Sequence, residues 1–474
     1  MRGHTAGTAL LAVLSVLLPP GCAQRGGSTD VPSFAGRGIQ RFAVSLQGED
    51  VGYMEVRIEE LPGDSLRVVQ ETSWDLVLMG SRRHVAMTLE ALTGADLDMA
   101  SMDLWMTDGT SEILTSSLRD GDTLRTVITT AGRDIEMESG FEGDYLPVLA
   151  DLAAATMDWE PGQERVFPTF DPATGMVFDA TVTCDGTEPA VLLGDTVIAT
   201  RLTISQVGLS NTVWVWEGQI VREEEAGLGM VMTRVPPGQT GDVSGTRDLY
   251  EVFAVSSTPV LDPRRLGSRT FEMHGDIDWS AFVLDYPPVQ VYDDGLVTVT
   301  TGVPGESVPF PPPDTGEFSR YLEAEPMLQS GDPLIMALAD SLTEGSRNAW
   351  DAAVRIATWV DQAVVNVPTV SLPSAVDVLE NLRGDCNEHT VLFVALARAA
   401  GIPARVCAGV VYLDGVFGYH SWPMVWVGEW VPMDPTLGQS VADPTHIILA
   451  EGSLESQYVI NSVMGRLSIT EVTR

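Results

Sequence analysis

The stretch RGDCNEHTVLF, from Arg383 to Phe393, places one of only four cysteines at the start of a strongly apolar segment. Asp385 is a suitable helix N-cap, because Glu388 follows three residues later and the two residues can form a capping box. The segment stays apolar as far as Ala400, where a glycine and then a proline follow. These signals predict a helix that begins at Cys386 and ends near Ala400.

A cysteine in the first turn of a helix has a chemical advantage over one in the middle. The N-terminus of a helix carries partial positive charge, which favours a thiolate. Its unsatisfied N–H groups can also hold an oxyanion that develops during acyl transfer. Cys386 is therefore a candidate nucleophile, although the position alone proves little, since most cysteines at helix starts are inert.

The partners that a cysteine nucleophile needs follow downstream. His420 lies in FGYHSW and Asp434 in WVPMDPT. Nucleophilic catalysis by a thiol requires a general base and a carboxylate that holds the imidazole in the correct tautomer. A helix followed by a strand with the histidine and another strand with the aspartate can deliver all three groups to one point.

The turn between the two predicted strands decides whether His420 and Asp434 share a face. A two-residue turn at Gly428–Glu429 would set Asp434 opposite Pro423 and point it away from His420. One extra residue, in a three-residue loop or a bulge, would set Asp434 opposite Trp422 on the same face as His420. We expect the extra residue, because prolines in both strands disfavour a regular ladder.

Taken together, GDCNEHTVLFVALARAAGIPARV, YHSW and WVPMDPT resemble the core of the transglutaminase-like superfamily, whose fold is related to papain-like cysteine peptidases. The resemblance extends from about Asp332 to Ile448. It implies an α+β core in which a central helix packs on an antiparallel sheet. It also implies Cys386 as nucleophile, His420 as general base and Asp434 as the residue that orients the base, without cofactor or metal.

The rest of the chain reads mainly as β structure. Alternating apolar runs separated by Asp-Gly turns predict a mostly antiparallel N-terminal domain, and YLPVLADLAAATM is a candidate short helix within it. A proline-rich linker, SVPFPPPDTGEF, precedes the helical part. The predicted regions are a signal peptide at 1–22, the N-terminal β-rich domain at 38–247, a β-rich connector with the linker at 248–320, and the catalytic core at 321–474.

The N-terminus predicts export. A basic start is followed by the apolar run TALLAVLSVLL, and Gly21–Cys22 resembles the end of a bacterial lipobox, although prolines precede it. We expect Cys22 to be lipidated and the protein to be anchored to the membrane, facing the periplasm. The alternative is ordinary cleavage after Ala23, which would give a secreted or periplasmic protein.

The charge of the chain restricts its partners. The 27 basic residues, all of them arginine, stand against 66 acidic residues and give a net charge of −39. Such a surface repels nucleic acid phosphates and anionic lipid headgroups. We therefore expect a peptide or protein substrate, no nucleic acid, and membrane contact only through the lipid anchor.

Several other residues have open or secondary roles. His389 is one turn beyond Cys386 on the same helix and would point past the thiol, so it is interpreted as a packing or hydrogen-bonding residue and not as the base. His446 is interpreted as structural, because the sequence shows no metal-binding partners for it at ligand spacing. Asn366 and the upstream tryptophans are only candidates for a side-chain oxyanion donor. Cys184 and Cys407 can pair in an oxidising compartment or remain as buried thiols.

Three hypotheses of function follow. The first is a cysteine hydrolase of peptide or isopeptide amide bonds that acts through a thioester in the cell envelope. The second is transfer of the same acyl group to an amine, as in a transglutaminase. The third is a non-catalytic binding or assembly lipoprotein. Hydrolysis leads, because water outcompetes amines unless a tunnel excludes it, and the sequence gives no sign of a tunnel.

Overall fold

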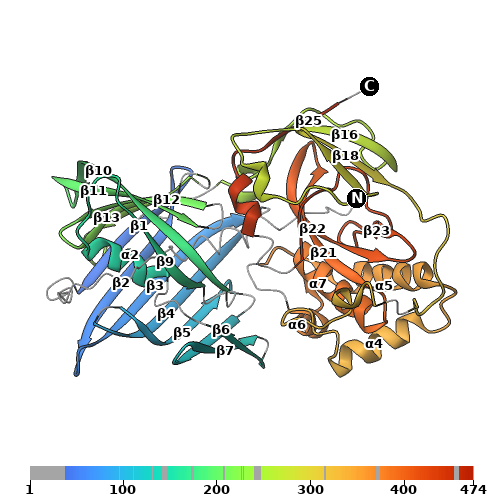
Figure 1. Cartoon of the computed structure of the whole chain (residues 1–474), viewed down its shortest axis with the longest axis horizontal. Helices are drawn as coiled ribbons and strands as arrows, with labels where there is room; N and C mark the ends of the chain where they lie inside the picture. The colour runs from blue at the N-terminus through green and yellow to red at the C-terminus, as the bar shows by residue number, and fades with distance from the viewer. Residues whose placement is uncertain are drawn as a thin grey trace. The chain divides into compact units, whose positions relative to one another are not determined.

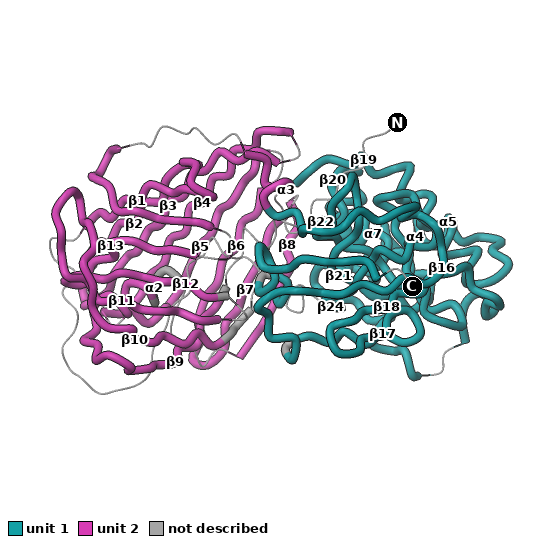
Figure 2. The backbone as a smooth tube through the Cα atoms, turned by 90° about the horizontal axis from the view of Figure 1, so that it is seen from above, with its two compact units in different colours: residues 1–10, 253–369, 373–474 teal, residues 11–252, 370–372 magenta. Residues whose placement is uncertain are grey.

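The computed structural model describes residues 38–472 with short gaps, and the predicted signal peptide with Cys22 lies outside the described residues. The chain divides into two compact units, one up to Val252 (unit 2) and one from Phe253 onward (unit 1), shown in Figure 2. The gaps fall at 79, 96, 110–111, 131, 141–146, 172–175, 207–208, 226, 228, 240–246, 314–315, 370–373 and 453–457.

Unit 2 is built on one 14-stranded antiparallel sheet, in which successive strands are neighbours except for β8 and β9 at its two ends, and β1 also pairs with β14 (Figure 1). The large antiparallel β region predicted ahead of the core is thus confirmed. Its elements are β1 (Ile39–Leu46), β2 (Glu49–Leu61), β3 (Ser65–Leu78), β4 (Ser81–Gly94), β5 (Met99–Thr107), β6 (Glu112–Asp120), β7 (Thr123–Thr130), β8 (Arg133–Gly140), α2 (Pro147–Thr156), β9 (Glu164–Asp171), β10 (Met176–Leu192), β11 (Asp195–Gln206), β12 (Leu209–Trp216), β13 (Gln219–Glu225), β14 (Met230–Val235) and α3 (Leu249–Val252).

The strands of unit 2 follow from alternation and turn chemistry. In β3 every second side chain toward its end, Trp74, Leu76 and Leu78, is buried, so that one face of the strand packs against the interior. The connection between β6 and β7 turns at Gly121, whose φ of 63° suits a tight hairpin turn. The sequence pattern of short apolar runs and Asp-Gly turns therefore becomes a meander of hairpins.

The short helix α2 confirms the helix predicted from YLPVLADLAAATM, and it packs against β9 and β13. It buries Asp151 near the carboxylates of β13, where Asn211 Nδ2 donates a hydrogen bond of 2.9 Å to Glu223 Oε1. Burial raises the pKa of both Asp151 and Glu223, and the charge of Glu225 raises the pKa of Glu223 further. Unit 2 thus holds acids that favour their neutral forms.

We predict that Glu223→Gln removes part of the pH dependence of the stability of unit 2. The folded state binds the Glu223 proton more tightly than the unfolded state, so stability falls as pH rises from the unfolded pKa of 4.5 through the higher folded pKa. In the wild type this loss approaches about 1 kcal/mol per pH unit. Urea unfolding at pH 5.5 and pH 7, read by pulsed hydrogen exchange of β13, measures it.

The matched control is Glu136→Gln on β8, since Glu136 is exposed. It should keep the wild-type slope. A Glu223→Gln protein with the wild-type slope would show that the buried carboxyls of unit 2 do not bind extra protons.

Unit 1 contains a four-stranded sheet of order β23-β22-β21-β24 and a five-stranded sheet of order β15-β25-β16-β18-β17. Its elements are β15 (Ser256–Ser257), β16 (Gly267–His274), η1 (Trp279–Ala281), β17 (Gln290–Asp293), β18 (Leu296–Thr301), η2 (Ser319–Tyr321), α4 (Pro333–Thr343), α5 (Ala349–Ala363), β19 (Val365–Asn366), α6 (Ala375–Asn381), β20 (Arg383–Gly384), α7 (Cys386–Ala399), β21 (Ala404–Leu413), β22 (Val416–Trp426), β23 (Trp430–Pro432), β24 (Ile447–Glu451), η3 (Tyr458–Val463) and β25 (Ser468–Glu471).

The helix α7 lies at the centre of unit 1. It contacts β21 and β22 on one side and α4, α5 and α6 on the others (Figure 1), and its residues are buried from Cys386 to Arg398. This explains why the sequence of α7 is apolar nearly all round. The relation of this arrangement to a papain-like core stays a prediction.

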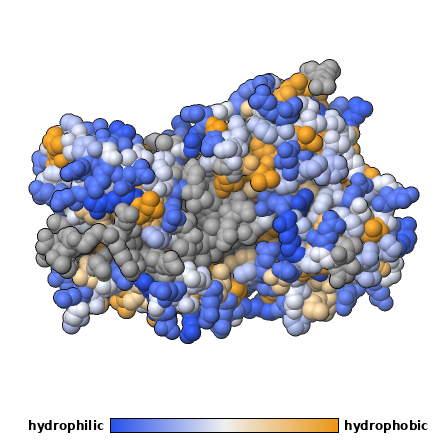
Figure 3. Space-filling view, in the orientation of Figure 1, coloured by the Kyte–Doolittle hydropathy of each residue, from blue (hydrophilic) through white to orange (hydrophobic). Residues whose placement is uncertain are grey.

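The segment that the sequence places in a connector, 248–320, supplies β15 to β18, and from Phe253 onward it clusters with the following residues in unit 1. Strand β16 pairs with β25 at the far end of the chain. Among the described residues, no helix is both long and apolar enough to cross a membrane. Hydrophilic residues cover most of the described surface on the face shown in Figure 3, in keeping with the net charge of −39.

Candidate active site in unit 1

Cys386 is the first residue of α7, and a capping box fixes the start of that helix. The Asp385 side chain accepts a hydrogen bond from Asn387 N at 3.1 Å, and Glu388 Oε2 accepts one from Asp385 N at 2.8 Å. The capping box predicted from the sequence is therefore confirmed. Burial raises the pKa of Asp385 well above its usual range, and the nearby charge of Glu388 adds to the rise.

A glycine makes this helix start possible. Gly384 in β20 pairs with Asn366 in β19 and has a φ of 154°. A Cβ at this position would lie 2.2 Å from Cβ of Glu388, so any side chain would collide with the capping box. Because of this pairing, Asn366, a candidate oxyanion donor, lies beside Gly384, which is two residues before Cys386 in the sequence.

We predict that Gly384→Ala destabilises unit 1 and disturbs the position of Cys386. The substitution combines an unfavourable φ with a clash against the Glu388 side chain, a strain on the order of 1 to 3 kcal/mol. Thermal unfolding measures the loss. Gly331→Ala is the matched control, because a Cβ there meets nothing within 4 Å. Equal midpoints for the two variants would contradict the proposed role of Gly384.

The hairpin between β22 and β23 sets the face on which Asp434 lies. Trp426 pairs with Trp430, so three residues form the loop, and the register predicts Trp422 as the residue opposite Asp434. His420 and Trp422 point to the same face, because they are two residues apart in one strand. His420 Nε2 lies 2.8 Å from Asp434 Oδ2, which confirms the expected extra residue.

The protonation of this pair follows from its surroundings. Burial alone would raise the pKa of Asp434, but the charges and hydrogen bonds of His420 and His446 outweigh burial and hold it well below its usual range. An ionised carboxylate only accepts hydrogen bonds, so His420 donates through Nε2–H. Its Nδ1 is buried and has no hydrogen-bond partner in the described part of the chain. In the tautomer with hydrogen on Nε2 alone, that nitrogen carries the lone pair that a general base needs.

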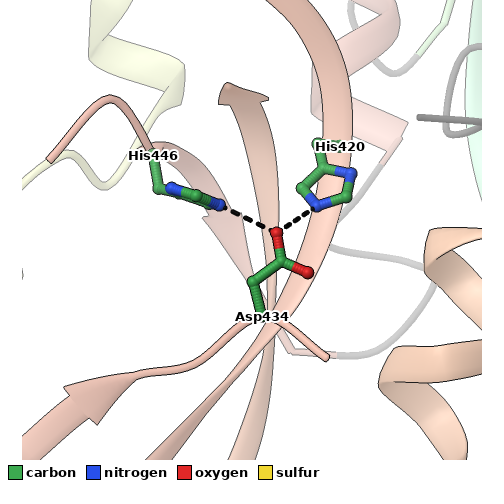
Figure 4. Close-up of side chains that lie close together, drawn as sticks. All are labelled: His420, Asp434 and His446. Carbon is green, nitrogen blue, oxygen red and sulfur yellow. Dashed lines mark hydrogen bonds and ion pairs between the residues drawn. The ribbon is translucent and has the colours of Figure 1, made fainter. Parts of the chain in front are cut away.

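A second histidine binds the same carboxylate oxygen. His446 Nε2 lies 3.0 Å from Asp434 Oδ2, and its Nδ1 lies 2.9 Å from the backbone oxygen of Asp443. Figure 4 shows the two imidazoles approaching Asp434 from different sides. All three side chains are buried. The sequence interpretation treated His446 as structural and did not find its bond to Asp434.

A repeated tripeptide could have drawn attention to His446. The sequence Asp-Pro-Thr begins at Asp434 and again at Asp443. In both copies the aspartate forms a local turn, because Oδ1 of Asp434 accepts from Leu437 N at 3.0 Å and Oδ1 of Asp443 accepts from Thr445 N at 2.9 Å. The second turn delivers His446 immediately before β24.

His420, Asp434 and His446 are residue types that bind metals, and their ligand atoms lie within 4.8 Å of one another. Their geometry, however, is that of a hydrogen-bonded network. Each imidazole directs its Nε2 at the same carboxylate oxygen. A metal ion would have to replace the protons that make both bonds. It would also push His420 Nε2 and Asp434 Oδ2 further apart than the 2.8 Å of their hydrogen bond. The donor set therefore fits protons better than a metal centre.

The first turn of α7 lies near this network. His389 is one turn beyond Cys386, and the charge of Asp434 acts on its pKa, although burial dominates and lowers it. His389 Nδ1 bonds the backbone oxygen of Asp385 at 2.6 Å, in line with the packing and hydrogen-bonding role expected for it. Helix α7 contacts β22, the strand that carries His420, and the meeting of Cys386 with His420 and Asp434 in one triad stays a prediction.

The other described cysteines are chemically different. Cys184 and Cys407 are both buried thiols, so the disulfide between them that the sequence allowed is not formed in this structure. Burial in β21 raises the pKa of Cys407 to about 12, although the charge of Arg405 acts in the opposite direction.

Trp422 is fully buried against the imidazoles of His420 and His446, and it belongs to the core rather than to an open cleft.

Residues 336–435 match the family model of the transglutaminase-like superfamily. The chain therefore contains a transglutaminase-like domain, as the motifs around Cys386, His420 and Asp434 predicted.

One curated relative is an uncharacterized protein of Mycobacterium leprae (strain TN), which is 32% identical over 95 residues. The match covers 18% of this chain and 34% of the relative, so the chain spans about a third of the relative's length.

Three solved structures show remote similarity. A candidate cysteine protease of Cytophaga hutchinsonii has 18% identity and a TM-score of 0.29, over 44% of this chain and 84% of the other. A β-barrel-like protein of Brucella abortus has 9% identity and a TM-score of 0.31, over 42% and 94%. A candidate protease of Parabacteroides distasonis has 12% identity and a TM-score of 0.19, over 72% and 68%.

Proposed function

We propose that the transglutaminase-like domain is a thiol-dependent hydrolase that cleaves peptide or isopeptide amide bonds through a thioester on Cys386. One observation carries the proposal: His420 donates Nε2–H to the ionised Asp434 and keeps Nδ1 without a partner among the described residues. A buried imidazole in this state is prepared to accept a proton. A purely structural histidine would be expected to use both of its nitrogens.

Acylation then proceeds in two steps. His420 Nδ1 takes the proton of the Cys386 thiol, and the thiolate sulfur attacks the carbonyl carbon of the substrate amide, forming a C–S bond. The tetrahedral intermediate collapses with cleavage of the C–N bond. The leaving nitrogen takes the proton from the His420 imidazolium, whose positive charge Asp434 has stabilised. The products are a free amine and a thioester.

Deacylation reverses the roles. A water molecule gives a proton to His420 Nδ1 while its oxygen attacks the thioester carbon, and collapse breaks the C–S bond and returns the proton to the Cys386 sulfur. The oxyanion of both intermediates needs donors. The backbone N–H of Cys386 is at the first helical position, which has no acceptor within the helix. Asn366, paired with Gly384, is our candidate for a side-chain donor.

An amine in place of water would give a new amide, which is the acyl transfer expected of a transglutaminase. Turnover of a peptide library with and without a primary amine acceptor separates the two outcomes. A free carboxylic acid as the main product in the presence of amine supports hydrolysis. A new amide as the main product assigns the domain to acyl transfer.

We predict different effects for the three proposed catalytic residues. Cys386→Ala and His420→Ala should each abolish nearly all turnover, because neither attack nor proton transfer has a substitute. Asp434→Asn should lower kcat/KM by roughly 10² to 10⁴, because an amide orients the imidazole but does not stabilise its charge. The measurement is kcat/KM on the best library peptide. Cys184→Ala, in unit 2, is the control and should retain wild-type rates.

Two results would count against this assignment. Wild-type rates in Asp434→Asn would remove Asp434 from the mechanism. Cleavage that survives Cys386→Ala, or the absence of any turnover by the wild type, would favour the third hypothesis, a non-catalytic binding or assembly protein.

We further propose that the hydrolase acts in the cell envelope as a lipoprotein. The support is the apolar N-terminal run followed by Gly21–Cys22. We predict that Cys22→Ser releases the protein from the membrane fraction and abolishes its labelling by fatty acid, whereas Cys184→Ser leaves both unchanged. A wild-type protein that is already soluble and begins at Gln24 would point to secretion instead.

A further inference from the structure

We propose that His446 is a positioning residue that holds Asp434 as a permanent cationic partner and so fixes the carboxylate that orients His420. In its kinetic consequence this inference rests on the proposed function, but the state of His446 can be tested without it. The motifs that predicted Cys386, His420 and Asp434 do not include His446, and the mechanism proposed above uses no atom of His446 as a reacting group.

The geometry alone indicates that His446 is charged. Its Nδ1 faces the backbone oxygen of Asp443 at 2.9 Å, and its Nε2 faces Asp434 Oδ2 at 3.0 Å. Both are acceptors without a proton to give, so both ring nitrogens of His446 must carry hydrogen to form these bonds. An imidazole protonated at both nitrogens is an imidazolium. His420 differs, because only its Nε2 has such a partner.

Charges of alternating sign stabilise this buried cation. Asp443 Oδ1 lies 3.7 Å from His446 Nδ1, and Arg264 in turn donates to Oδ2 of Asp443. Burial alone would lower the pKa of His446, but the charge of Asp443 and the hydrogen bond to Asp434 raise it to about 9. These groups form a row whose charges alternate in sign, from the partly exposed guanidinium inward to the catalytic carboxylate. The order is Arg264, Asp443, His446 and Asp434.

The groups that face His446 come from several segments. Asp434 and His420 lie on the β22–β23 side, and Trp422 packs its ring edge-on at 4.9 Å between centroids. Asp443 belongs to the turn before His446. Arg264 lies at a cavity of about 600 Å³ that Leu437 and Gln439 also line. The inner end of the row is thus shielded by apolar groups, and the outer end meets a cavity.

The backbone of His446 is held firmly. The residue directly precedes β24, which pairs with β21. Gly409 of β21 lies opposite His420, and a Cβ there would lie 2.0 Å from the carbonyl oxygen of Ile447. Because Gly409 has no side chain, β24 can approach β21 closely. Strand β21 in turn pairs with β22, the strand that carries His420. This fixes the distance between the two histidines.

The carboxylate of Asp434 is consequently held at both oxygens. Oδ2 accepts from His420 and His446, and Oδ1 accepts from Leu437 N at 3.0 Å. Without the bond to His446, fewer contacts would prevent the Asp434 carboxylate from rotating. The carboxylate would then hold the His420 imidazole in a less well defined orientation. Misplacement of a catalytic group by about 1 Å costs roughly 100-fold in rate.

Two substitutions separate position from charge. His446→Ala removes both, and we expect kcat/KM to fall on the order of 10- to 100-fold, mainly through kcat, because Asp434 is no longer fixed. His446→Gln keeps a donor for Asp434 but no charge, so it should recover most of kcat. In both variants the acidic limb of the pH profile should move to higher pH, because the proposed mechanism needs a neutral His420 imidazole and the loss of the second cation beside Asp434 favours the imidazolium. His274→Gln, at an exposed histidine of β16, is the control.

Two measurements do not depend on turnover. In protein labelled at histidine, the ring nitrogen signals of His446 should show a doubly protonated imidazole at pH 7.5 that titrates near pH 9. The pH profile of Cys386 alkylation should shift in His446→Gln and not in His274→Gln. If the wild type has no turnover, these two results still decide the role of His446.

A neutral His446 at pH 7.5 would overturn the inference. So would His446→Ala and His446→Gln proteins whose activity falls only in proportion to their folded fraction, with unchanged pH profiles for both kcat/KM and alkylation. That pattern would make His446 a structural residue alone.

Discussion

The candidate site depends on one ionised carboxylate in an apolar interior. Asp434 is fully buried, and a lone charge there would be very unfavourable. It remains charged because two imidazoles and a backbone N–H donate to it. Three features of the fold bring these donors to the carboxylate. They are the β22–β23 hairpin, the second Asp-Pro-Thr turn and the close approach of β24 to β21. The local fold can therefore be understood as the means of keeping this charge in place.

A buried network of this kind has a cost as well as a benefit. Pairs of buried charges often stabilise a protein less than apolar side chains of the same volume would. What the network does provide is a single geometry, because both carboxylate oxygens of Asp434 and both ring nitrogens of His446 have fixed partners. The chain from Arg264 through Asp443 and His446 to Asp434 is best explained as a gain in orientation at the expense of stability.

Local signals in the sequence predicted much of this site, and contacts between distant segments explain what they missed. The capping box of Asp385 and Glu388 and the parity of the β22–β23 hairpin depend on neighbouring residues, so both could be derived. His446 could not be assigned, because its place depends on the pairing of β24 with β21 and on a register shift next to Gly409. The role of residues 253–320 was hidden in the same way, since β16 pairs with β25 near the C-terminus.

The three-residue loop between Trp426 and Trp430 restricts how this domain can change over time. Side chains alternate in a strand, so inserting or deleting one residue there would turn Asp434 to the far side of the sheet. A change of two residues would preserve its direction. The length of this hairpin can thus drift only in even steps, and natural variants of the loop should differ in length by pairs of residues wherever the carboxylate is retained.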